Sequence, residues 1–555
     1  MERYDDTTTN LSEHLSRAAK CLPNKKAVIC HGGYNRGGKP IYRHRTFLEL
    51  EQETDRLAHA FQRIGIRKGC RTILMVKPSI ELFCVTFALL RVGAVPVMID
   101  PGMGRQNLVD NLSSVGAEAF IGIPLAHGLR VLSGRKFSTV RVNVTVGPRL
   151  FWGGYSLRDL VREPWRPFEP VPSRPDDMAG IFFTTGSTGP PKGVVYEHGM
   201  FDTQVRYLSS HFGYGENDID LATFPLFALF DCVLGITAVI PDMDPTKPAK
   251  ADPRKIIQAL IDNGCNSLYG SPALLENLSR HGEQTGVKLP QLKRIITAGA
   301  PARPALLEAL HRMLPGDAKL HTPYGATEVL PVSSIDSHEI VDATRYSSEM
   351  GSGTCVGKPM AGMQVAIIRI TDEPIAHWLQ AEELSRREIG EITVKGPVVT
   401  KEYFQRPEAT RSAKIVDERD GGIWHRMGDV GYLDEWGRLW FCGRKTHRVE
   451  IPGAVLFTIP CEAVFNRHPR VRRSALVGVG RPGNRKPVII IELKEGDKGE
   501  DKVTLTSELL ALGRTDPRTR LIRDVLYHPG FPVDIRHNAK IFREKLAIWA
   551  ERVLK

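Results

Sequence analysis

Ten consecutive residues combine the groups that an enzyme needs to hold a polyphosphate. The segment reads Thr184, Thr185, Gly186, Ser187, Thr188, Gly189, Pro190, Pro191, Lys192 and Gly193. Its glycines let the backbone approach an anion closely, its four hydroxyls donate hydrogen bonds, and Lys192 adds a mobile positive charge. It is not a Walker A loop, because Lys192 has neither a preceding Gly nor a following Ser or Thr. Apolar runs at Ile181–Phe183 and Val194–Tyr196 predict a strand on each side, so we expect a phosphate loop between two strands.

These ten residues resemble the signature of the adenylate-forming superfamily, which includes acyl-CoA synthetases, luciferases and the adenylation domains of peptide synthetases. Other motifs of that superfamily recur in order along nearly the whole chain. They are Gly299-Ala300-Pro301, Tyr324-Gly325-Ala326-Thr327-Glu328, Gly428-Asp429, Gly443-Arg444 and Asn538-Ala539-Lys540-Ile541. The resemblance implies an enzyme that consumes ATP and activates a carboxylic acid as its acyl-adenylate, releasing pyrophosphate.

The resemblance also implies a role for individual residues. Those implied to bind ATP or AMP are Thr184, Thr185, Gly186, Ser187, Thr188, Gly189, Gly299, Ala300, Pro301, Tyr324, Gly325, Asp429 and Arg444. Those implied in catalysis are Lys192, Thr327, Glu328 and Lys540, with Glu328 holding Mg²⁺. The chemistry fits these residue types. Attack of a carboxylate on the α-phosphate joins two anions, so the Mg²⁺ and the Lys540 ammonium would neutralise charge in the transition state. A carboxylate such as Asp429 suits two vicinal ribose hydroxyls.

Four positions depart from the common superfamily pattern. Superfamily members swing a small C-terminal domain about a hinge, where Asp or Lys is usual and this chain has Thr446. The residue before the catalytic lysine is Ala539 in place of Gly, and two residues are inserted between Gly453 and Pro460. Ala228 stands where a typical acyl-CoA synthetase has His near its thiol-entry tunnel. This last departure argues against a standard transfer to CoA.

Several of these segments resemble one subgroup, the OleC-type β-lactone synthetases of bacterial long-chain olefin biosynthesis. The segments are Tyr196–Phe201, Pro225–Phe230, Ile240–Thr246 and Asp534–Lys540. The resemblance implies a long-chain 2-alkyl-3-hydroxy fatty acid as substrate, with ATP and Mg²⁺ as cofactors. Its own 3-hydroxyl would attack the acyl-adenylate, release AMP and close a β-lactone. A complex with other olefin-pathway enzymes, including a decarboxylating partner, is implied by the resemblance alone.

An internal hydroxyl needs no second substrate, because correct folding of the substrate raises its effective concentration. A proton acceptor would help, and His198, His537 and the AMP phosphate are all candidates. Two alkyl chains need a long apolar pocket. The candidate pocket residues are Phe227, Ala228, Phe230 and His198, although ordinary core packing explains such apolar runs equally well.

Two other functions remain open from the sequence. One is a long-chain fatty acyl-CoA synthetase, or a ligase that passes its acyl-AMP to a thiol of a carrier protein. The other is a nucleotide-binding scaffold that has lost activity and organises partner enzymes. A reaction with ATP, Mg²⁺ and a 2-alkyl-3-hydroxy acid, without any thiol, separates them.

The elements that must position these residues follow an alternating pattern. Helical spacing at Leu48–Ile64, a short apolar run at Thr72–Val76 and further helix–strand alternation between residues 256 and 313 predict parallel sheets covered by helices. After Gly351 the pattern changes to short strands separated by Gly, Pro and Asp. We therefore expect an α/β fold with a β-rich subdomain and a small, mobile α+β C-terminal domain. The expected boundaries are 1–443 for the adenylation domain, 444–447 for the hinge and 448–555 for the C-terminal lid.

The composition is that of a globular, multidomain chain. It has 555 residues, 42% hydrophobic and 25% charged, with a net charge of +12. The densest basic run, Arg467–Arg485, has no interleaved aromatic residues, which argues against nucleic-acid binding. Nine cysteines occur singly, without a metal or redox motif, as is usual in a reducing cytoplasm. The apolar stretch Val85–Ile99 is interrupted by Arg91 and too short to span a bilayer, so we expect a cytoplasmic protein without a membrane span.

Overall fold

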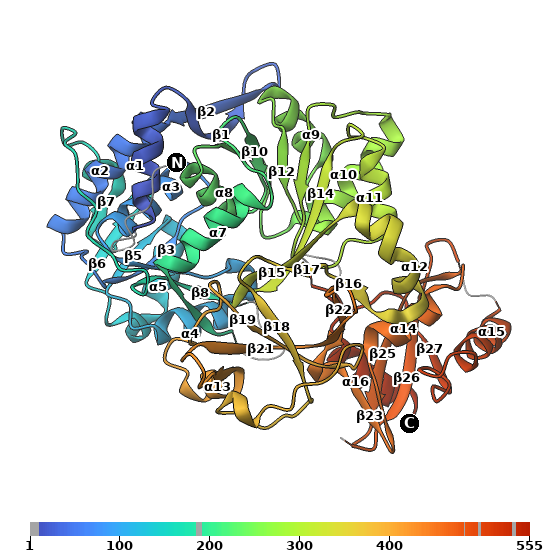
Figure 1. Cartoon of the computed structure of the whole chain (residues 1–555). Helices are drawn as coiled ribbons and strands as arrows, with labels where there is room; N and C mark the ends of the chain where they lie inside the picture. Colours follow the sequence, from blue (N-terminus) through green and yellow to red (C-terminus); the bar gives the residue numbers. More distant parts are fainter. Residues whose placement is uncertain (1–9, 185–190, 482, 498–500, 535–539) are drawn as a thin grey trace.

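The computed structural model describes residues 10–184, 191–481, 483–497, 501–534 and 540–555 (Figure 1). Several residues singled out above therefore lie outside the described residues. They are Thr185, Gly186, Ser187, Thr188, Gly189, His537, Asn538 and Ala539.

The first layer is a seven-stranded sheet in the order β7-β6-β5-β3-β4-β8-β9, parallel except for the β8–β9 pair. Its strands are β3 (Arg71–Met75), β4 (Val95–Met98), β5 (Ala119–Gly122), β6 (Val142–Thr145), β7 (Tyr155–Ser156), β8 (Met178–Phe183) and β9 (Gly193–Glu197). The helices that follow these strands or precede the sheet are α2 (Phe47–Arg63), α3 (Ile80–Arg91), α4 (Arg105–Ser114), α5 (Pro124–Leu132) and α6 (Leu157–Leu160). The expected loop between two strands is confirmed at its ends, since β8 and β9 are its flanking strands.

The second layer is a nine-stranded sheet in the order β17-β15-β14-β13-β12-β10-β11-β1-β2. Its strands are β1 (Lys26–Tyr34), β2 (Pro40–Thr46), β10 (Ile219–Ala222), β11 (Thr237–Ile240), β12 (Ser267–Tyr269), β13 (Arg294–Ile296), β14 (Lys319–Ala326), β15 (Val329–Asp336) and β17 (Lys358–Pro359). Its helices are α1 (Ser12–Cys21), α7 (His198–Ser210), α8 (Pro225–Val233), α9 (Pro253–Asp262), α10 (Pro272–Thr285) and α11 (Pro304–His311). The strands from β14 to β1 are parallel, which confirms the predicted βα layers.

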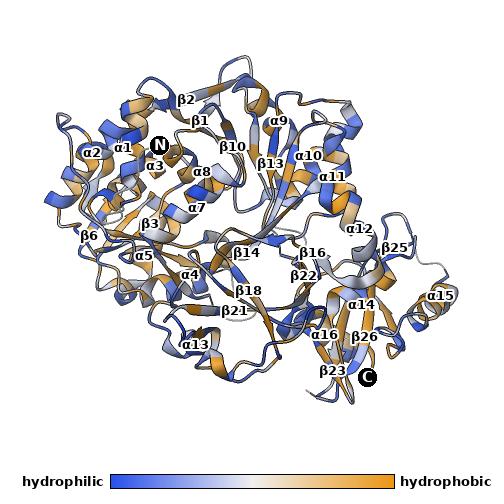
Figure 2. Ribbon diagram, viewed as in Figure 1, coloured by the Kyte–Doolittle hydropathy of each residue, from blue (hydrophilic) through white to orange (hydrophobic). Residues whose placement is uncertain are grey.

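The main core lies between these two sheets. Helix α3 is apolar all round and almost completely buried, as expected of a helix with no solvent-facing side. Its last residue, Arg91, is also fully buried, and its guanidinium pairs with Asp55 and Glu51 of α2, so the charge is compensated. Helices nearer the surface, such as α10 and α11, are hydrophobic on one side and hydrophilic on the other (Figure 2).

The predicted β-rich segment forms a third, antiparallel sheet, with β20 paired to β21 beside the path β16-β22-β21-β19-β18. Its strands are β16 (Thr354–Cys355), β18 (Gln364–Ile368), β19 (Gly390–Lys395), β20 (Lys414–Val416), β21 (Ile423–Leu433) and β22 (Leu439–Arg444). Two short helices, α12 (Arg345–Ser347) and α13 (Pro407–Ala413), adjoin it.

The last part of the chain is a small α+β unit, as expected. Its strands are β23 (Val449–Ile451) and β24 (Ala454–Leu456) in one hairpin, and β25 (Val471–Val479), β26 (Lys486–Leu493) and β27 (Asp524–Tyr527) in a three-stranded sheet. Its helices are α14 (Thr458–Asn466), α15 (Lys502–Arg514) and α16 (Arg543–Val553). Its Arg518 donates to the backbone oxygens of Met350 and Gly351, which precede the β-rich sheet. Among the described residues no helix combines the length and apolar character needed to cross a membrane.

Candidate functional site

Three residues predicted to bind the nucleotide meet at the junction of two sheets. Antiparallel pairing of β21 with β22 sets Asp429 opposite Arg444, and Arg444 Nη1 donates to Asp429 Oδ1 at 2.6 Å. The hydroxyl of Tyr324, on β14, donates to the other oxygen, Oδ2, also at 2.6 Å. The nearby carboxylate raises the pKa of Arg444, while burial and then the same carboxylate raise the pKa of Tyr324. The guanidinium of Arg444, the carboxyl group of Asp429 and the neutral phenol of Tyr324 are thereby held in one arrangement.

Close packing explains the glycine before Arg444. Gly443 has φ of 131°, and a Cβ built there would lie 2.3 Å from Thr458 Oγ1 on α14. Gly325, after Tyr324, is equally restricted, because its Cβ would lie 2.5 Å from the backbone oxygen of Val329. Both glycines are thus required by the close approach of a second segment.

The tight turn between β14 and β15 carries Thr327 and Glu328 and is held by side chains that the sequence did not reveal. Tyr403 Oη donates to Glu328 Oε1 at 2.7 Å, and Tyr196 Oη donates to the backbone oxygen of Thr327 at 2.7 Å. Thr400 donates to the backbone oxygen of Glu328 from its N–H at 3.0 Å and from Oγ1 at 2.9 Å. Four hydrogen bonds thus hold the turn.

Lys192 lies beside this turn. Its ammonium is 4.7 Å from the centre of the Tyr403 ring, a cation–π contact. At the base of the predicted phosphate loop, Lys192 N donates to Thr184 Oγ1 at 3.2 Å and Thr184 N donates to Lys192 O at 2.9 Å. The two described ends of the loop are thus hydrogen-bonded to each other. Lys192 lies beside Glu328, because both contact the side chain of Tyr403.

A buried lysine and a buried histidine lie behind the turn. Antiparallel pairing of β20 with β21 sets Lys414 opposite His425. Lys414 Nζ donates to the backbone oxygen and Oγ1 of Thr400, and burial lowers its pKa to about 7, partly offset by Glu328. Burial, with the cations of Lys414, Lys192 and Arg444, lowers the pKa of His425 well below its usual value. His425 Nδ1 has no hydrogen-bond partner among the described residues. Lys414 and His425 differ from other lysines and histidines of the chain only in their tertiary surroundings, so no sequence motif could identify them.

The residues around Glu328 fit a bound Mg²⁺. Glu328 is half-buried, and Tyr403 donates to its Oε1, while Oε2 accepts no hydrogen bond from the described residues. A single carboxylate suits Mg²⁺, which is usually held by one or two carboxylates together with phosphate oxygens and water. The described residues contain no cluster of three or more His, Cys, Asp or Glu suited to a metal.

An apolar cavity adjoins the nucleotide residues. Its lining residues are Gln204, Tyr207, Leu208, Phe212, Phe227, Phe230, Tyr269, Ile296, Ala298, Pro323, Leu330 and Pro331, around a free volume of about 60 Å³. Phe227 stacks on Tyr269 with ring centres 4.0 Å apart. Ala298 immediately precedes Gly299 and Pro323 immediately precedes Tyr324, so one end of the cavity meets two of the motifs predicted to bind ATP or AMP. Phe227 and Phe230, expected in the acyl pocket, both line it.

The structure places two other expected pocket residues elsewhere. Ala228 is fully buried in the core between the sheets, because consecutive residues of α8 point to different sides of the helix. His198 begins α7 and is also buried, where its Nδ1 accepts a 3.4 Å hydrogen bond from Leu11 N. Burial lowers the pKa of His198 to about 4. Neither residue lines the apolar cavity.

The remaining predicted residues lie in loops. Gly299, Ala300 and Pro301 connect β13 to α11. Thr446 is exposed in the single turn Lys445–His447 that follows β22. Lys540 is exposed, and its backbone oxygen accepts a hydrogen bond from Asp534 N at 3.0 Å.

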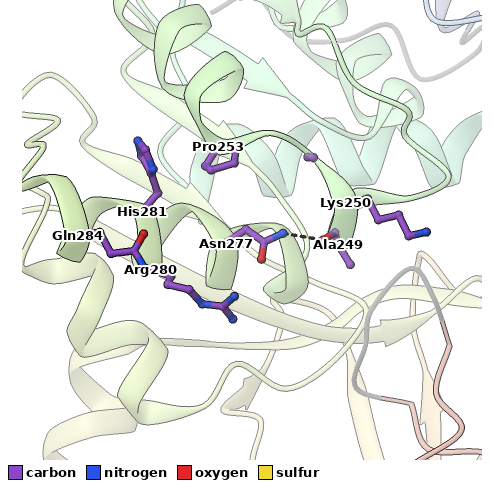
Figure 3. Close-up of a pocket in the computed structure, with 8 residues that line it drawn as sticks. Ala249, Lys250, Pro253, Asn277, Arg280, His281 and Gln284 are labelled. Carbon is purple, nitrogen blue, oxygen red and sulfur yellow. Dashed lines mark hydrogen bonds between the residues drawn. The ribbon is translucent and has the colours of Figure 1, made fainter. Parts of the chain in front are cut away.

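A second depression, of about 280 Å³, lies away from these residues (Figure 3). It is formed by the segment Pro248–Lys250 with the start of α9 and one side of α10, and Asn277 Nδ2 donates to Ala249 O at 2.6 Å. No residue predicted to be functional lines it.

These features coincide with a known family. Residues 15–404 match the family described as AMP-binding enzyme, and the chain belongs to that family. Two relatives are named olefin beta-lactone synthetase. The one from Xanthomonas campestris pv. campestris is 46% identical over 549 residues, covering 98% of both chains. The one from Stenotrophomonas maltophilia is 46% identical over 553 residues, covering 98% of this chain and 99% of the relative. A long-chain-fatty-acid–CoA ligase from Thermus thermophilus is 25% identical over 504 residues, covering 89% and 87%.

Solved structures confirm the fold class. The amide bond synthetase McbA from Marinactinospora thermotolerans superimposes with a TM-score of 0.78 at 21% identity, covering 97% of this chain and 99% of that one. The ATP-bound MatB from Rhodopseudomonas palustris gives a TM-score of 0.76 at 21% identity, covering 98% and 100%. At this identity the likeness concerns the fold alone.

Proposed function

We propose that this enzyme is an olefin β-lactone synthetase that acts on a long-chain 2-alkyl-3-hydroxy acid. The observation that carries the proposal is the 46% identity, over 98% of this chain, to the two relatives that bear this name. The buried cluster of Tyr324, Asp429 and Arg444 and the turn at Glu328 supply the nucleotide chemistry that such an activity needs.

In the first step a carboxylate oxygen of the acid attacks the α-phosphorus of ATP. The bond from that phosphorus to the bridging oxygen breaks, and pyrophosphate leaves. Asp429 accepts hydrogen bonds from the ribose hydroxyls, and Tyr324 lies against the adenine. Lys192 and Lys540 neutralise phosphate charge, with the Thr184–Gly193 loop around the phosphates. Glu328 would hold Mg²⁺, which supplies Lewis-acid stabilisation of the phosphate oxygens.

In the second step the 3-hydroxyl oxygen attacks the acyl carbon of the adenylate. The bond between that carbon and the phosphate oxygen breaks, AMP leaves, and the hydroxyl proton passes to a base. The AMP phosphate is the acceptor best placed by its chemistry, because it gains charge as it leaves. His198 is buried against Leu11, so its position favours a structural role.

The remaining features of the proposal concern the setting of the enzyme. All nine cysteines are free, and eight of them are buried, which suits a reducing cytoplasm. A hydrophobic acid as substrate and a lactone as product suit a complex with other enzymes of an olefin pathway, which the proposal includes. We assign residues 1–443 to the adenylation domain, 444–447 to the hinge and 448–555 to a lid that carries Lys540.

The test is a reaction without any thiol. The purified enzyme, ATP, Mg²⁺ and a 2-alkyl-3-hydroxy acid should yield AMP, pyrophosphate and a β-lactone, identified by mass spectrometry and its carbonyl absorption. The matched substrate without the 3-hydroxyl should be adenylated but give no lactone. Product formation that requires CoA would instead identify an acyl-CoA synthetase.

A further inference from the structure

A surface helix displays its large apolar side chains to solvent. Helix α5 buries Ala126 and His127, whereas Leu125 and Leu132 are 81% and 76% exposed. These two leucines are seven residues apart and therefore lie on one side of the helix. Ala126 and Leu129 of α5 pack against the core, whereas Leu125 and Leu132 face solvent, although a surface helix normally turns such residues inwards.

The adjoining loop between β6 and β7 exposes two more large apolar side chains. The Trp152 ring stacks on His127 of α5, with centres 5.4 Å apart and planes at 10°, and its Nε1 donates to Thr145 Oγ1 at 2.9 Å. Because Trp152 takes the inward place, its neighbours Leu150 and Phe151 remain 56% and 82% exposed. The stacking places this loop beside the first turn of α5, so the exposed side chains of the loop and of the helix belong to neighbouring parts of the surface.

The same part of the chain is strongly basic. Between Ala119 and Arg158 there is no Asp or Glu, and the basic residues are Arg130, Arg135, Lys136, Arg141, Arg149 and Arg158. Lys136 is paired with Asp110 of α4, the neighbouring element, and Arg130 packs over the Phe120 ring. The other four arginines are exposed and form no ion pair with any described residue. We call Leu125, Leu132, Leu150 and Phe151, with Arg135 and Arg149, the α5 surface.

We propose that the α5 surface docks onto an anionic lipid bilayer. Transfer of the exposed leucine and phenylalanine side chains from water into the acyl region lowers the free energy. The arginines around them are attracted to anionic headgroups. No carboxylate lies in this segment to neutralise the four exposed arginines, so their charge can attract a layer of anionic headgroups. In Figure 1, α5 and β6 lie on the side of the molecule far from α15, so docking leaves the C-terminal part of the chain clear of the membrane. The proposal is independent of the lactone chemistry.

The test is flotation of the full-length protein with vesicles. We expect binding to phosphatidylcholine vesicles containing about one third phosphatidylglycerol, weaker binding to pure phosphatidylcholine, and weakening with salt. Leu125→Gln with Phe151→Gln should lower partitioning about tenfold or more. Arg135→Gln with Arg149→Gln should lower it about tenfold at low salt.

Matched controls distinguish binding through the α5 surface from non-specific hydrophobic or electrostatic binding by the rest of the protein. Leu379→Gln with Val503→Gln removes equally exposed apolar residues elsewhere, and Arg481→Gln with Arg523→Gln removes the same charge. Both controls should bind vesicles as the parent does. Absence of vesicle binding by the parent would overturn the proposal, as would equal loss in the controls. If the α5 variants lose a co-purifying protein while no form binds vesicles, the surface is a protein interface and the lipid proposal is wrong.

Discussion

Asp429 and Arg444 face each other across the β21–β22 pairing, with Arg444 Nη1 2.6 Å from Asp429 Oδ1. Tyr324 occupies the second carboxylate oxygen. Arg444 is the first residue of the proposed hinge, so the group proposed to bind ribose is tied directly to the start of the segment on which the lid would turn. In the proposed mechanism, nucleotide binding and lid position would therefore share the Asp429 carboxylate.

Asp429→Asn should weaken ATP binding about 10-fold to 100-fold. The substitution keeps the shape but removes the charge that orients Arg444 and accepts two strong hydrogen bonds. Isothermal titration calorimetry measures the change. Tyr324→Phe serves as the comparison, because it leaves the carboxylate intact and should cost about threefold or less. Equal affinity of the Asn variant and the parent would contradict the ribose role.

Lys540→Ala should slow adenylate formation about 100-fold or more while the protein stays folded. The ammonium is expected to neutralise charge that develops only in the transition state, so ATP affinity should change little. ATP–pyrophosphate exchange measures the step. Lys545→Ala, on the nearby α16, is the control and should retain the parental rate. An unchanged exchange rate in the Lys540 variant would remove this residue from the mechanism.

Lys414→Met should change the pH dependence of stability. The pKa of Lys414 falls from 10.5 to about 7 on folding. Between these values the unfolded chain holds a proton that the folded protein releases, so this group destabilises the protein increasingly as pH falls from about 10 to 7. The melting temperature of the Met variant relative to the parent should therefore be highest near pH 7 and decline towards pH 10. A difference that is constant across this range would show that the amine is charged when folded.

The Lys414 variant also tests the support of the turn that we propose to bind Mg²⁺. Lys414 holds Thr400, which in turn donates to the backbone of Glu328. Loss of this support should raise the Mg²⁺ concentration required for half-maximal pyrophosphate exchange by about threefold to tenfold, with less effect on ATP affinity. Lys414→Arg, which retains a donor to Thr400, should restore part of the loss.

His198→Asn should leave lactone formation within about twofold of the parent. His198 is buried at the start of α7, and Asn retains an acceptor for Leu11 N. Its pKa of about 4 when folded lies below the ordinary 6.5, so the parent loses stability from this group as pH falls from about 6.5 to 4. The melting temperature of the variant should fall less steeply over this range. His338→Asn, at an exposed histidine, is the control. Loss of lactone by a folded variant would restore His198 as a proton acceptor.

Gly325 and Gly443 could be found from the sequence because they belong to motifs that resemble those of the adenylate-forming superfamily. The structure adds the physical reason for glycine, since a Cβ at either position would meet another segment. The βα layers could be predicted from hydrophobic periodicity, which is a local signal. The support of Glu328 could not be found, since Tyr403 and Thr400 reach it from the segment between β19 and α13, and Lys414 reaches Thr400 from β20. These contacts form only in the tertiary fold.

The two differences at the expected pocket have a related cause. A short apolar run such as Pro225–Phe230 does not show which side of its helix faces a cavity. In the structure Phe227 and Phe230 face the cavity, whereas Ala228 enters the core. Ala228 does not line the cavity, so it can affect the use of CoA only indirectly, through the packing behind the cavity wall.

Phe230→Ala should shift substrate preference towards longer alkyl chains. The cavity beside the nucleotide residues has about 60 Å³ of free volume, far below the roughly 300–1,000 Å³ of ordinary ligand pockets. We therefore expect rings to move when a two-chain acid enters this cavity. The centre of the Phe230 ring lies 6.3 Å from that of Phe227 and 5.9 Å from that of Phe201. Removing the Phe230 ring lowers the free energy needed to admit an alkyl chain, and it does so more for a long chain than for a short one.

The measurement is the ratio of kcat/KM for a long and a short 2-alkyl-3-hydroxy acid, which should rise about tenfold in the Phe230 variant. Phe224→Ala is the matched control, because its ring precedes the same helix but is largely exposed and does not line the cavity. The Phe230 substitution should also cost up to about 3–5 kcal/mol of stability, so circular dichroism must verify the fold at the assay temperature. An unchanged ratio in a folded variant would place the alkyl chains elsewhere, and the stacked pair Phe227 and Tyr269 would then be a wall of the core and not of the acyl pocket.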